Sequence, residues 1–203
     1  MATTPFLSRR ASVLPAQTYG ATVLERPRRL RTTIGGESLA VASYLSSLHA
    51  EKDPRARLQR GVDLLPTLVA GCDHASVTTV AGGRTEVRAA SDSTARRADQ
   101  LQDELDDGPS LQAARTGHSV VARDLSAETR WPDWCSATVD ELGVRSVLSV
   151  LLIANPNPVA TLDLYSSAVD GVSLVDLARL HTLAGPLADA LLHDRHGVDR
   201  PAA

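Results

Sequence analysis

The sequence predicts an α+β domain built on an antiparallel β-sheet, with a helical layer on one face of that sheet. Two pairs of strand-like runs are each joined by a short turn-forming segment, Gly82-Gly83 in the first pair and Asn155–Pro158 in the second. Connections of this kind join antiparallel strands. Helical patterns flank the strand region at 53–71 and 173–193, and flanking helices commonly pack together on one face of a sheet.

The first long helical pattern has a clear start and a clear end. Asp53 is a favourable N-cap residue, and Pro54 fits the first turn of a helix. Gly71 is expected to end the helix, and Pro66 to kink it. Apolar residues recur between them at helical spacing, at Leu58, Val62, Leu65 and Val69. A shorter helix is expected before it, over 37–50.

Five segments are expected to form strands, namely 75–81, 84–90, 119–125, 144–154 and 159–166. The fourth is apolar on both faces, which is typical of a covered inner strand. The fifth alternates, with Thr161, Asp163 and Tyr165 on one side. We therefore expect a half-buried strand with one polar face. Between the strands, 93–105 is expected to be an exposed helix, and 110–116 and 132–142 shorter helices.

Composition excludes several classes of protein. The chain has 203 residues and a formal net charge of −3, which fits one domain with extensions and gives no reason to expect a nucleic-acid partner. Its two cysteines, Cys72 and Cys135, are too few for a disulfide framework and fit a reducing compartment. Neither a membrane-spanning apolar run nor a secretory leader is recognisable, so we expect a cytoplasmic protein with no membrane partner.

Four segments are expected along the chain. Residues 1–35 form a flexible, Arg-bearing arm, 36–54 a short helix and linker, 55–195 the folded domain, and 196–203 a C-terminal tail. The arm carries four clustered arginines, Arg26, Arg28, Arg29 and Arg31. A cluster of this size supports only weak, salt-sensitive binding, so no sequence-specific recognition of nucleic acid is expected.

Five short segments of the sequence, taken in order, resemble a known family. They are Gly71–Thr78, Asp107–Ala113, Arg130–Pro132, Glu141–Ser146 and Leu162–Ser166. Over 55–193 the chain resembles GAF domains, most closely those that precede an ANTAR domain in actinobacterial transcription antiterminators. The resemblance implies a GAF/PAS-like antiparallel sheet with terminal helices packed on one face, and a sensory or regulatory role. Because few residues follow His193, no ANTAR part is expected in this chain.

The chain departs from the better-known GAF activities. Asp163 stands where cyclic-nucleotide-binding GAF domains have Asn, and Val172 where they have Phe. GAF-type methionine sulfoxide reductases carry their catalytic cysteines in and near a Gly-x-Gly-Val-Cys-Gly string, which is missing here. The turn before the third strand instead carries Ser110, which cannot perform thiol redox chemistry. We therefore predict that the chain is not an enzyme. No haem attachment motif or metal-binding spacing occurs, so no cofactor and no metal are expected.

The predicted ligand-binding residues are Trp131, Trp134, Arg145, Asp163 and Tyr165. Both tryptophans precede or begin the helix that covers the pocket side of the sheet in the GAF domains that the chain resembles. Aromatic walls with a few polar groups suit a small-molecule pocket. The alternative is that both tryptophans simply fill the core.

The leading hypothesis is a sensory or regulatory domain that binds a small molecule or signals to a partner regulator protein. One alternative is a ligand-free dimerisation or scaffold module, and another is a thiol redox sensor or enzyme that uses Cys135 or Cys72. A homodimer through the terminal helices is also predicted. In the last helix, apolar residues cover more than one stripe, and they include Leu174, Leu177, Leu180, Leu183, Leu187 and Leu191.

Overall fold

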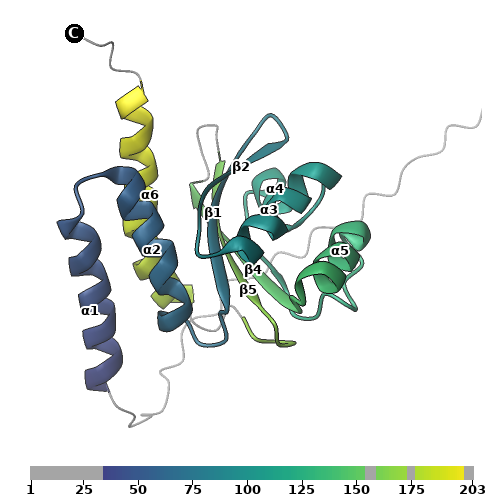
Figure 1. Cartoon of the computed structure of the whole chain (residues 1–203), viewed down its shortest axis with the longest axis horizontal. Helices are drawn as coiled ribbons and strands as arrows, with labels where there is room; N and C mark the ends of the chain where they lie inside the picture. The colour runs from purple at the N-terminus through teal and green to yellow at the C-terminus, as the bar shows by residue number, and fades with distance from the viewer. Residues whose placement is uncertain (1–33, 154–158, 173–176, 199–203) are drawn as a thin grey trace, which may run out of the picture. The chain divides into compact units, whose positions relative to one another are not determined.

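The structure is a computed structural model that describes residues 34–153, 159–172 and 177–198 (Figure 1). The arm predicted for 1–35 therefore lies almost wholly outside the described residues, as do the Asn155–Pro158 turn, Leu174 and the end of the tail. The elements follow in the order α1 (Ile34–Ala50), α2 (Pro54–Leu68), β1 (His74–Ala81), β2 (Arg84–Ala90), α3 (Ser93–Leu105), α4 (Pro109–Thr116), β3 (Val120–Ala122), α5 (Pro132–Leu142), β4 (Ser146–Ile153), β5 (Val159–Ser166) and α6 (Leu177–Val198).

The five strands form one antiparallel sheet in the order β2-β1-β5-β4-β3. The β1–β2 hairpin turns at Gly82-Gly83, where φ is +58° and +81°. Both values lie in the left-handed region, which only glycine enters at little cost and which tight hairpin turns require. β5 lies at the centre of the sheet, so its two edges are hydrogen-bonded to β1 and β4.

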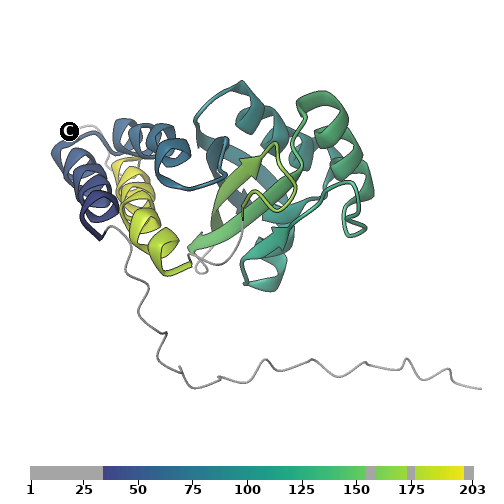
Figure 2. The same ribbon diagram turned by 90° about the horizontal axis from the view of Figure 1, so that it is seen from below.

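Helices cover both faces of the sheet. α1, α2 and α6 lie on one side, and α3, α4 and α5 lie on the other (Figures 1 and 2). The face toward α2 and α6 is apolar and includes Val77, Leu148, Val150, Leu162 and Leu164. The predicted α+β fold, with an antiparallel sheet and the terminal helices on one face, is confirmed.

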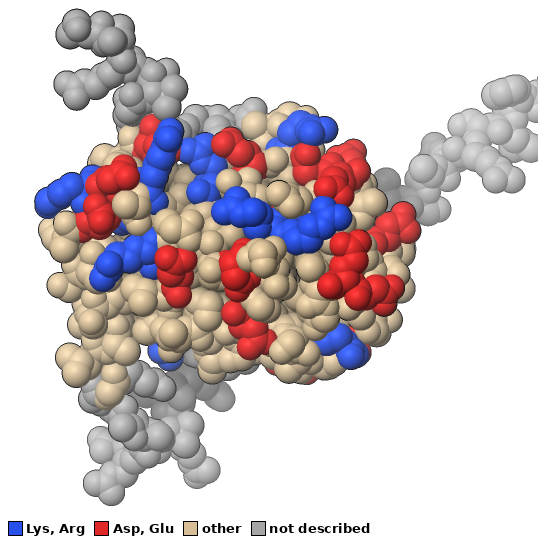
Figure 3. All heavy atoms as spheres, in the orientation of Figure 1, with Lys and Arg blue, Asp and Glu red and all other residues tan. Residues whose placement is uncertain are grey.

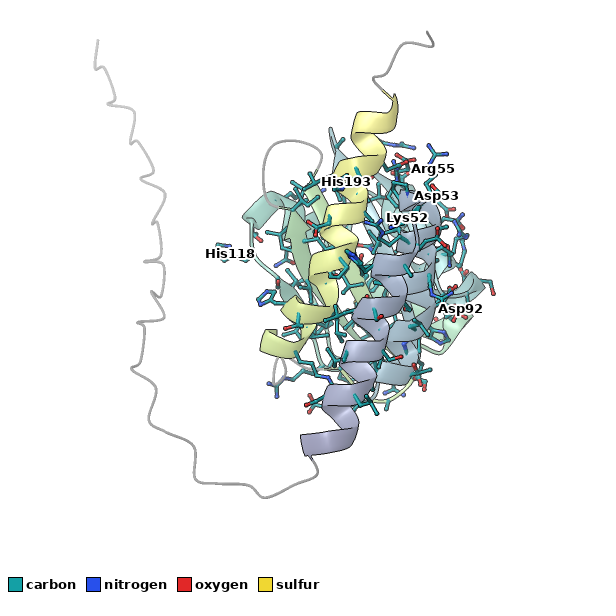
Figure 4. The ribbon with its side chains drawn as sticks, turned by 90° about the vertical axis from the view of Figure 1, so that its left-hand side faces the viewer. Lys52, Asp53, Arg55, Asp92, His118 and His193 are labelled. Atoms are coloured by element: carbon teal, nitrogen blue, oxygen red, sulfur yellow. The ribbon has the colours of Figure 1, made fainter. Side chains whose placement is uncertain are left out.

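The terminal helices pack closely on one another, as the face-on view of this layer shows (Figure 4). The Tyr44 hydroxyl on α1 donates to the Leu183 carbonyl on α6 at 2.9 Å. A Cβ at Gly61 on α2 would lie 2.3 Å from a methyl group of Leu187, so this glycine permits the close approach of α2 and α6. At one end of the layer, Arg55 pairs with Asp194 at 2.9 Å.

Four of the leucines of α6 that motivated the dimer prediction are buried within the chain. Leu180, Leu183, Leu187 and Leu191 are at most 3% exposed, and they share one core cluster with residues of α1 and α2. The surplus of apolar residues is therefore covered by α1, and these leucines no longer argue for a second copy. Within the described ranges, no helix has the length and hydrophobicity needed to cross a bilayer.

The surface of the described chain carries both signs of charge. On the face shown in Figure 3, basic and acidic side chains alternate, and neither sign forms a continuous patch. Many of them pair, as Arg97 does with Glu104 at 2.7 Å and Arg84 with Asp103 at 2.7 Å. This face therefore gives no sign of the extended basic surface that binding to nucleic acid requires.

Candidate functional site

The second face of the sheet carries a row of polar side chains across three strands. Ser76 on β1 pairs with Asp163 on β5, and Asp163 pairs with Ser149 on β4. One step along, Thr78 pairs with Thr161. Directly opposed residues share a face, and all five side chains are completely buried. The expectation that β5 is half-buried is therefore wrong, because α3 and α4 cover its polar face.

α3 buries one side against the sheet, contrary to the exposed helix expected for 93–105. Asp92 caps its N-terminus by accepting from the Ala95 amide at 3.0 Å. Its inward side holds Ala95, Ala98, Asp99, Leu101 and Gln102. Asp99 and Gln102 are three positions apart and so lie on the same side of the helix. Both are fully buried and reach the polar row of the sheet.

Asp163 lies at the centre of this polar cluster. One carboxyl oxygen, Oδ1, accepts from the Ser110 hydroxyl on α4 at 2.7 Å and also from the Ser149 hydroxyl. The other, Oδ2, accepts from the Thr161 hydroxyl at 2.9 Å. Burial raises the pKa of Asp163, and the hydroxyl donors Ser149, Ser110 and Thr161 oppose that effect. The carboxyl is thus held entirely by neutral donors.

Asp99 is a second buried carboxyl in the same cluster. Its Oδ1 accepts from the Tyr165 hydroxyl and from the Gln102 side-chain amide. Burial, and then the negative charge of Asp163, raises its pKa to about 7. Among the described residues, no Lys or Arg forms an ion pair with Asp99 or Asp163. The two carboxyls are therefore an acidic pair without a protein cation.

Gln102 connects the two carboxyls. Its amide nitrogen donates to the Ser110 hydroxyl at 3.1 Å, and its amide oxygen accepts from the Ser110 backbone at 2.8 Å. The Ser110 hydroxyl in turn donates to Asp163. The turn between α3 and α4 depends on Gly108, whose φ is +143°. A Cβ at this position would lie 2.6 Å from the Gln102 side chain, so glycine is required there.

Two more hydroxyls of the sheet serve the second carboxyl. Hydrogen bonding from Ser76 and Thr78 on β1 opposes the rise in the pKa of Asp99 that its burial causes. A hydroxyl donates to a carboxylate oxygen. Asp99, like Asp163, is therefore surrounded by neutral donors.

A family model described as a GAF domain matches residues 51–192. That is well over half of the chain. The chain belongs to the GAF domain family. A comparison with curated protein sequences found no match. Membership of the GAF family supports a sensory or regulatory role.

Several solved GAF structures share this fold. The GAF domain of an Acinetobacter phosphoenolpyruvate-protein phosphotransferase is 13% identical, with a TM-score of 0.61 over 81% of this chain and 98% of that one. A free methionine-R-sulfoxide reductase from Neisseria meningitidis, in complex with its substrate, is 19% identical, with a TM-score of 0.59 over 79% and 91%. A type II enzyme of the same kind from Thermoplasma acidophilum is 17% identical, with a TM-score of 0.54 over 69% and 93%.

The similarity to reductases overturns the prediction that this GAF chain is not an enzyme. At these identities the likeness shows the fold alone, but a fold shared with enzymes cannot support the exclusion of catalysis. The prediction rested on the missing thiol string and on Ser110. The absence of that sequence motif excludes only one arrangement of catalytic thiols. Catalytic groups can also be brought together in space from separate elements of the fold.

Two of the five predicted site residues meet in the polar cluster of the GAF domain. Asp163 and Tyr165 both face α3, and Tyr165 donates to Asp99. Arg145 instead pairs with Asp124 at 3.6 Å, and its side chain is 39% exposed. Their binding of a ligand stays a prediction. The cluster also contains residues that the sequence did not single out, namely Ser76, Thr78, Asp99, Gln102, Ser110, Ser149 and Thr161.

The two tryptophans are buried beside the polar cluster. Trp131 and Trp134 meet edge to face with ring centroids 6.0 Å apart, in an apolar cluster that also includes Tyr165. The Trp134 indole donates to the Ala98 carbonyl at 3.0 Å. Since Ala98 precedes Asp99, this hydrogen bond ties α5 to the segment of α3 that carries the acidic pair. The tryptophans thus contribute to the core, and Trp134 reports on α3.

The thiols lie in two different parts of the core. Cys72 belongs to the cluster beneath α2, and Cys135 to the cluster that includes Trp134. Burial raises the pKa of both thiols to about 12. The reactive form of cysteine is the thiolate, so in this conformation both thiols are held in their unreactive form at neutral pH.

One signal in the sequence could have identified the missing half of the site. In 93–105, Asp99 and Gln102 are flanked by Ala95, Ala98 and Leu101. Those apolar residues define an inward stripe, and the two polar residues fall inside it. A polar pair within an apolar stripe is a buried pair when the helix is covered. The many charged residues elsewhere in the helix concealed this pattern.

Proposed function

We propose that this GAF domain is a sensory module that binds a small molecule at the polar cluster between the sheet and α3/α4. The observation that carries the proposal is the buried acidic pair, Asp99 and Asp163, which neutral side chains hold without an ion pair to any described Lys or Arg. A polar cluster of this kind destabilises a fold relative to well-packed apolar side chains. A ligand-free scaffold would gain nothing from that cost, whereas a binding site requires such groups.

The contacts around the cluster supply a route by which binding would alter the protein. Asp99 and Ala98 are adjacent on α3, and Ala98 accepts the indole hydrogen bond of Trp134 on α5. A ligand that contacts Asp99 would therefore act on the segment of α3 that is tied to α5, and a displacement of α3 would be passed to α5. We propose that this displacement is passed to a partner regulator protein. The resemblance to actinobacterial GAF regulators, in which a GAF domain precedes an output domain, supports a role of this kind.

Native mass spectrometry of protein purified from its own host tests the proposal. The wild type should retain a small molecule that Asp163→Asn loses. Asp106→Asn is the matched control, because Asp106 is 77% exposed and lies in the left-handed region at φ 49°, which Asn tolerates well. Wild-type protein without any bound molecule, or equal retention by Asp163→Asn, contradicts a ligand site at this cluster.

A second candidate function is reduction of free methionine-R-sulfoxide. It is favoured by the reductases among the structures that share this fold. The assay follows consumption of the free sulfoxide with a dithiol donor. Turnover that disappears in Cys135→Ser or Cys72→Ser would assign the activity to that thiol. Because burial raises the pKa of both thiols, turnover would also require a conformation that exposes one of them.

A further inference from the structure

We infer that the cavity between α1, α2 and α6 binds a free α-amino acid with an apolar side chain. Arg57 would hold its carboxylate, Asp189 its ammonium group, and Leu45, Leu48 and Pro186 its side chain. The three helices cover the face of the sheet opposite the polar cluster (Figures 1 and 2). The cavity is therefore a second site, and the inference does not depend on the proposed function.

The cavity has a volume of about 440 Å³, and it lies where the C-terminal half of α1 runs beside α6 (Figure 4). All three terminal helices contribute to its lining, α2 through Arg57. Pockets for small molecules commonly measure about 300–1,000 Å³, so this one has room for an amino acid. His49 and Asp189 in the lining are exposed, so a ligand reaches the cavity from solvent without any movement of the helices.

Part of the lining is apolar. Leu48 is completely buried, whereas Leu45 and Pro186 are half-buried and keep part of their surface toward solvent. Removal of such surface from water favours binding in proportion to the area that the ligand covers. An aliphatic or aromatic side chain would therefore add to the affinity, and a ligand without a side chain would lose that contribution.

Two charges of opposite sign line the same cavity without pairing. Neither Arg57 nor Asp189 forms an ion pair, with each other or with any other residue in the described ranges. A ligand with one charge would leave one of these two side chains unpaired. An α-amino acid carries a carboxylate and an ammonium group on the same carbon, so it can pair with both.

The hydrogen bonds of both charged residues leave them able to bind a ligand. Arg57 Nε and Nη2 donate to the Glu51 carbonyl at 3.1 Å and 2.7 Å. A guanidinium group has five N–H donors in a planar fork, so this contact orients the group and leaves donors for a carboxylate. Orienting a binding group in advance lowers the entropic cost of binding. On α6, His193 Nδ1 lies 2.7 Å from the backbone carbonyl oxygen of Asp189, a contact that does not involve the Asp189 carboxylate.

The test is a calorimetric titration of the full-length protein with L-leucine, L-methionine and L-phenylalanine at neutral pH and constant ionic strength. The matched probes are the carboxamide of each amino acid, which lacks the carboxylate, its deamino acid, which lacks the ammonium group, and glycine, which lacks the side chain. At least one of the three amino acids should bind saturably and raise the thermal unfolding midpoint, because it joins three helices of the folded state. Its matched probes should each bind roughly 10- to 100-fold more weakly, the range expected for the loss of one charge-assisted hydrogen bond or one covered side chain.

Two variants assign the charges to their partners. Arg57→Gln should weaken amino-acid binding by roughly 10- to 100-fold and leave binding of the carboxamide unchanged. Asp189→Asn should weaken it to a similar extent and leave binding of the deamino acid unchanged. Arg60→Gln is the matched control, because Arg60 is exposed on α2 and lies outside this cavity. Asp163→Asn, in the polar cluster on the other face of the sheet, should also bind as the wild type does.

Asp189→Asn keeps the test independent of folding, because Asp189 is exposed and the substitution should leave the unfolding midpoint unchanged. The inference is overturned if none of the three amino acids binds at about 10 mM, or if the carboxamide or the deamino acid binds as tightly as the amino acid itself. Undiminished binding by Asp189→Asn or by Arg57→Gln overturns it as well. None of these outcomes bears on the polar cluster, whose own test uses Asp163→Asn.

Discussion

Replacing Asp99 with Asn should stabilise the protein at alkaline pH. Asp99 is fully buried, and its pKa rises from its usual 3.8 to about 7. The folded state therefore holds a proton that the unfolded state has released between these two values. It follows that the stability of the wild type falls as pH rises through this window. Asn cannot ionise, so the variant does not lose this stability.

The size of the effect follows from the same pKa. One pKa unit corresponds to about 1.4 kcal/mol, so the raised pKa of Asp99 lowers the unfolding free energy, relative to its value at low pH, by on the order of 4 kcal/mol at pH 8 and by about 2 kcal/mol at pH 5. In Asp99→Asn, the side-chain amide oxygen can still accept from Tyr165. The new amide nitrogen would face the Ser76 and Thr78 hydroxyls, which hydrogen-bond to Asp99 in the wild type and whose oxygens can accept as well as donate. No hydrogen bond need therefore be lost in the exchange.

Urea unfolding at pH 5 and at pH 8 provides the measurement. Asp99→Asn should exceed the wild type in unfolding free energy at both pH values, with the larger gain at pH 8. Asp106→Asn, at an exposed position, should stay within about 0.5 kcal/mol of the wild type throughout. If Asp99→Asn is no more stable than the wild type at pH 8, or if its gain does not change with pH, the raised pKa of Asp99 is not what limits stability.

Three further predictions concern packing and assembly. Thr161→Val should lower the unfolding free energy by about 1–2 kcal/mol, because it removes a donor to the buried Asp163 carboxyl; an unchanged midpoint in thermal unfolding would contradict the hydrogen-bond assignment. Gly108→Ala should lower the unfolding free energy by about 2–3 kcal/mol, because φ at this position is +143° and the new Cβ would meet the Gln102 side chain. Chemical denaturation measures the change, and an unchanged unfolding free energy would exclude this contact. The predicted homodimer through the terminal helices is tested by sedimentation at micromolar concentration. Leu39 on α1 is 71% exposed, and Leu39→Asp should dissociate the dimer. A wild type that sediments as a monomer rules the dimer out.

The elements and their order could be predicted from local patterns in the sequence. Asp53-Pro54 starts α2 and Gly82-Gly83 closes the first hairpin, because capping and positive φ depend on a residue and its immediate neighbours. The predicted helices and strands agree with the structure in type and order, although β3 is limited to Val120–Ala122 and α2 ends at Leu68, before Gly71. The antiparallel sheet with terminal helices on one face followed from them. The GAF resemblance, confirmed by the family match over 51–192, rests on strings that are equally local.

The burial of the polar residues, and the partners they meet, became visible only in the folded chain. Alternation along β5 separates one face from the other, but it does not show that α3 and α4 cover the polar face. Asp99 and Asp163 are 64 positions apart by residue number, and they meet because α3 crosses a sheet in which β5 lies at the centre. In the same way, the leucines of α6 could be assigned to a partner chain until α1 was seen to cover them. Burial and pairing are properties of contacts between distant segments, and the order of residues along the chain does not specify them.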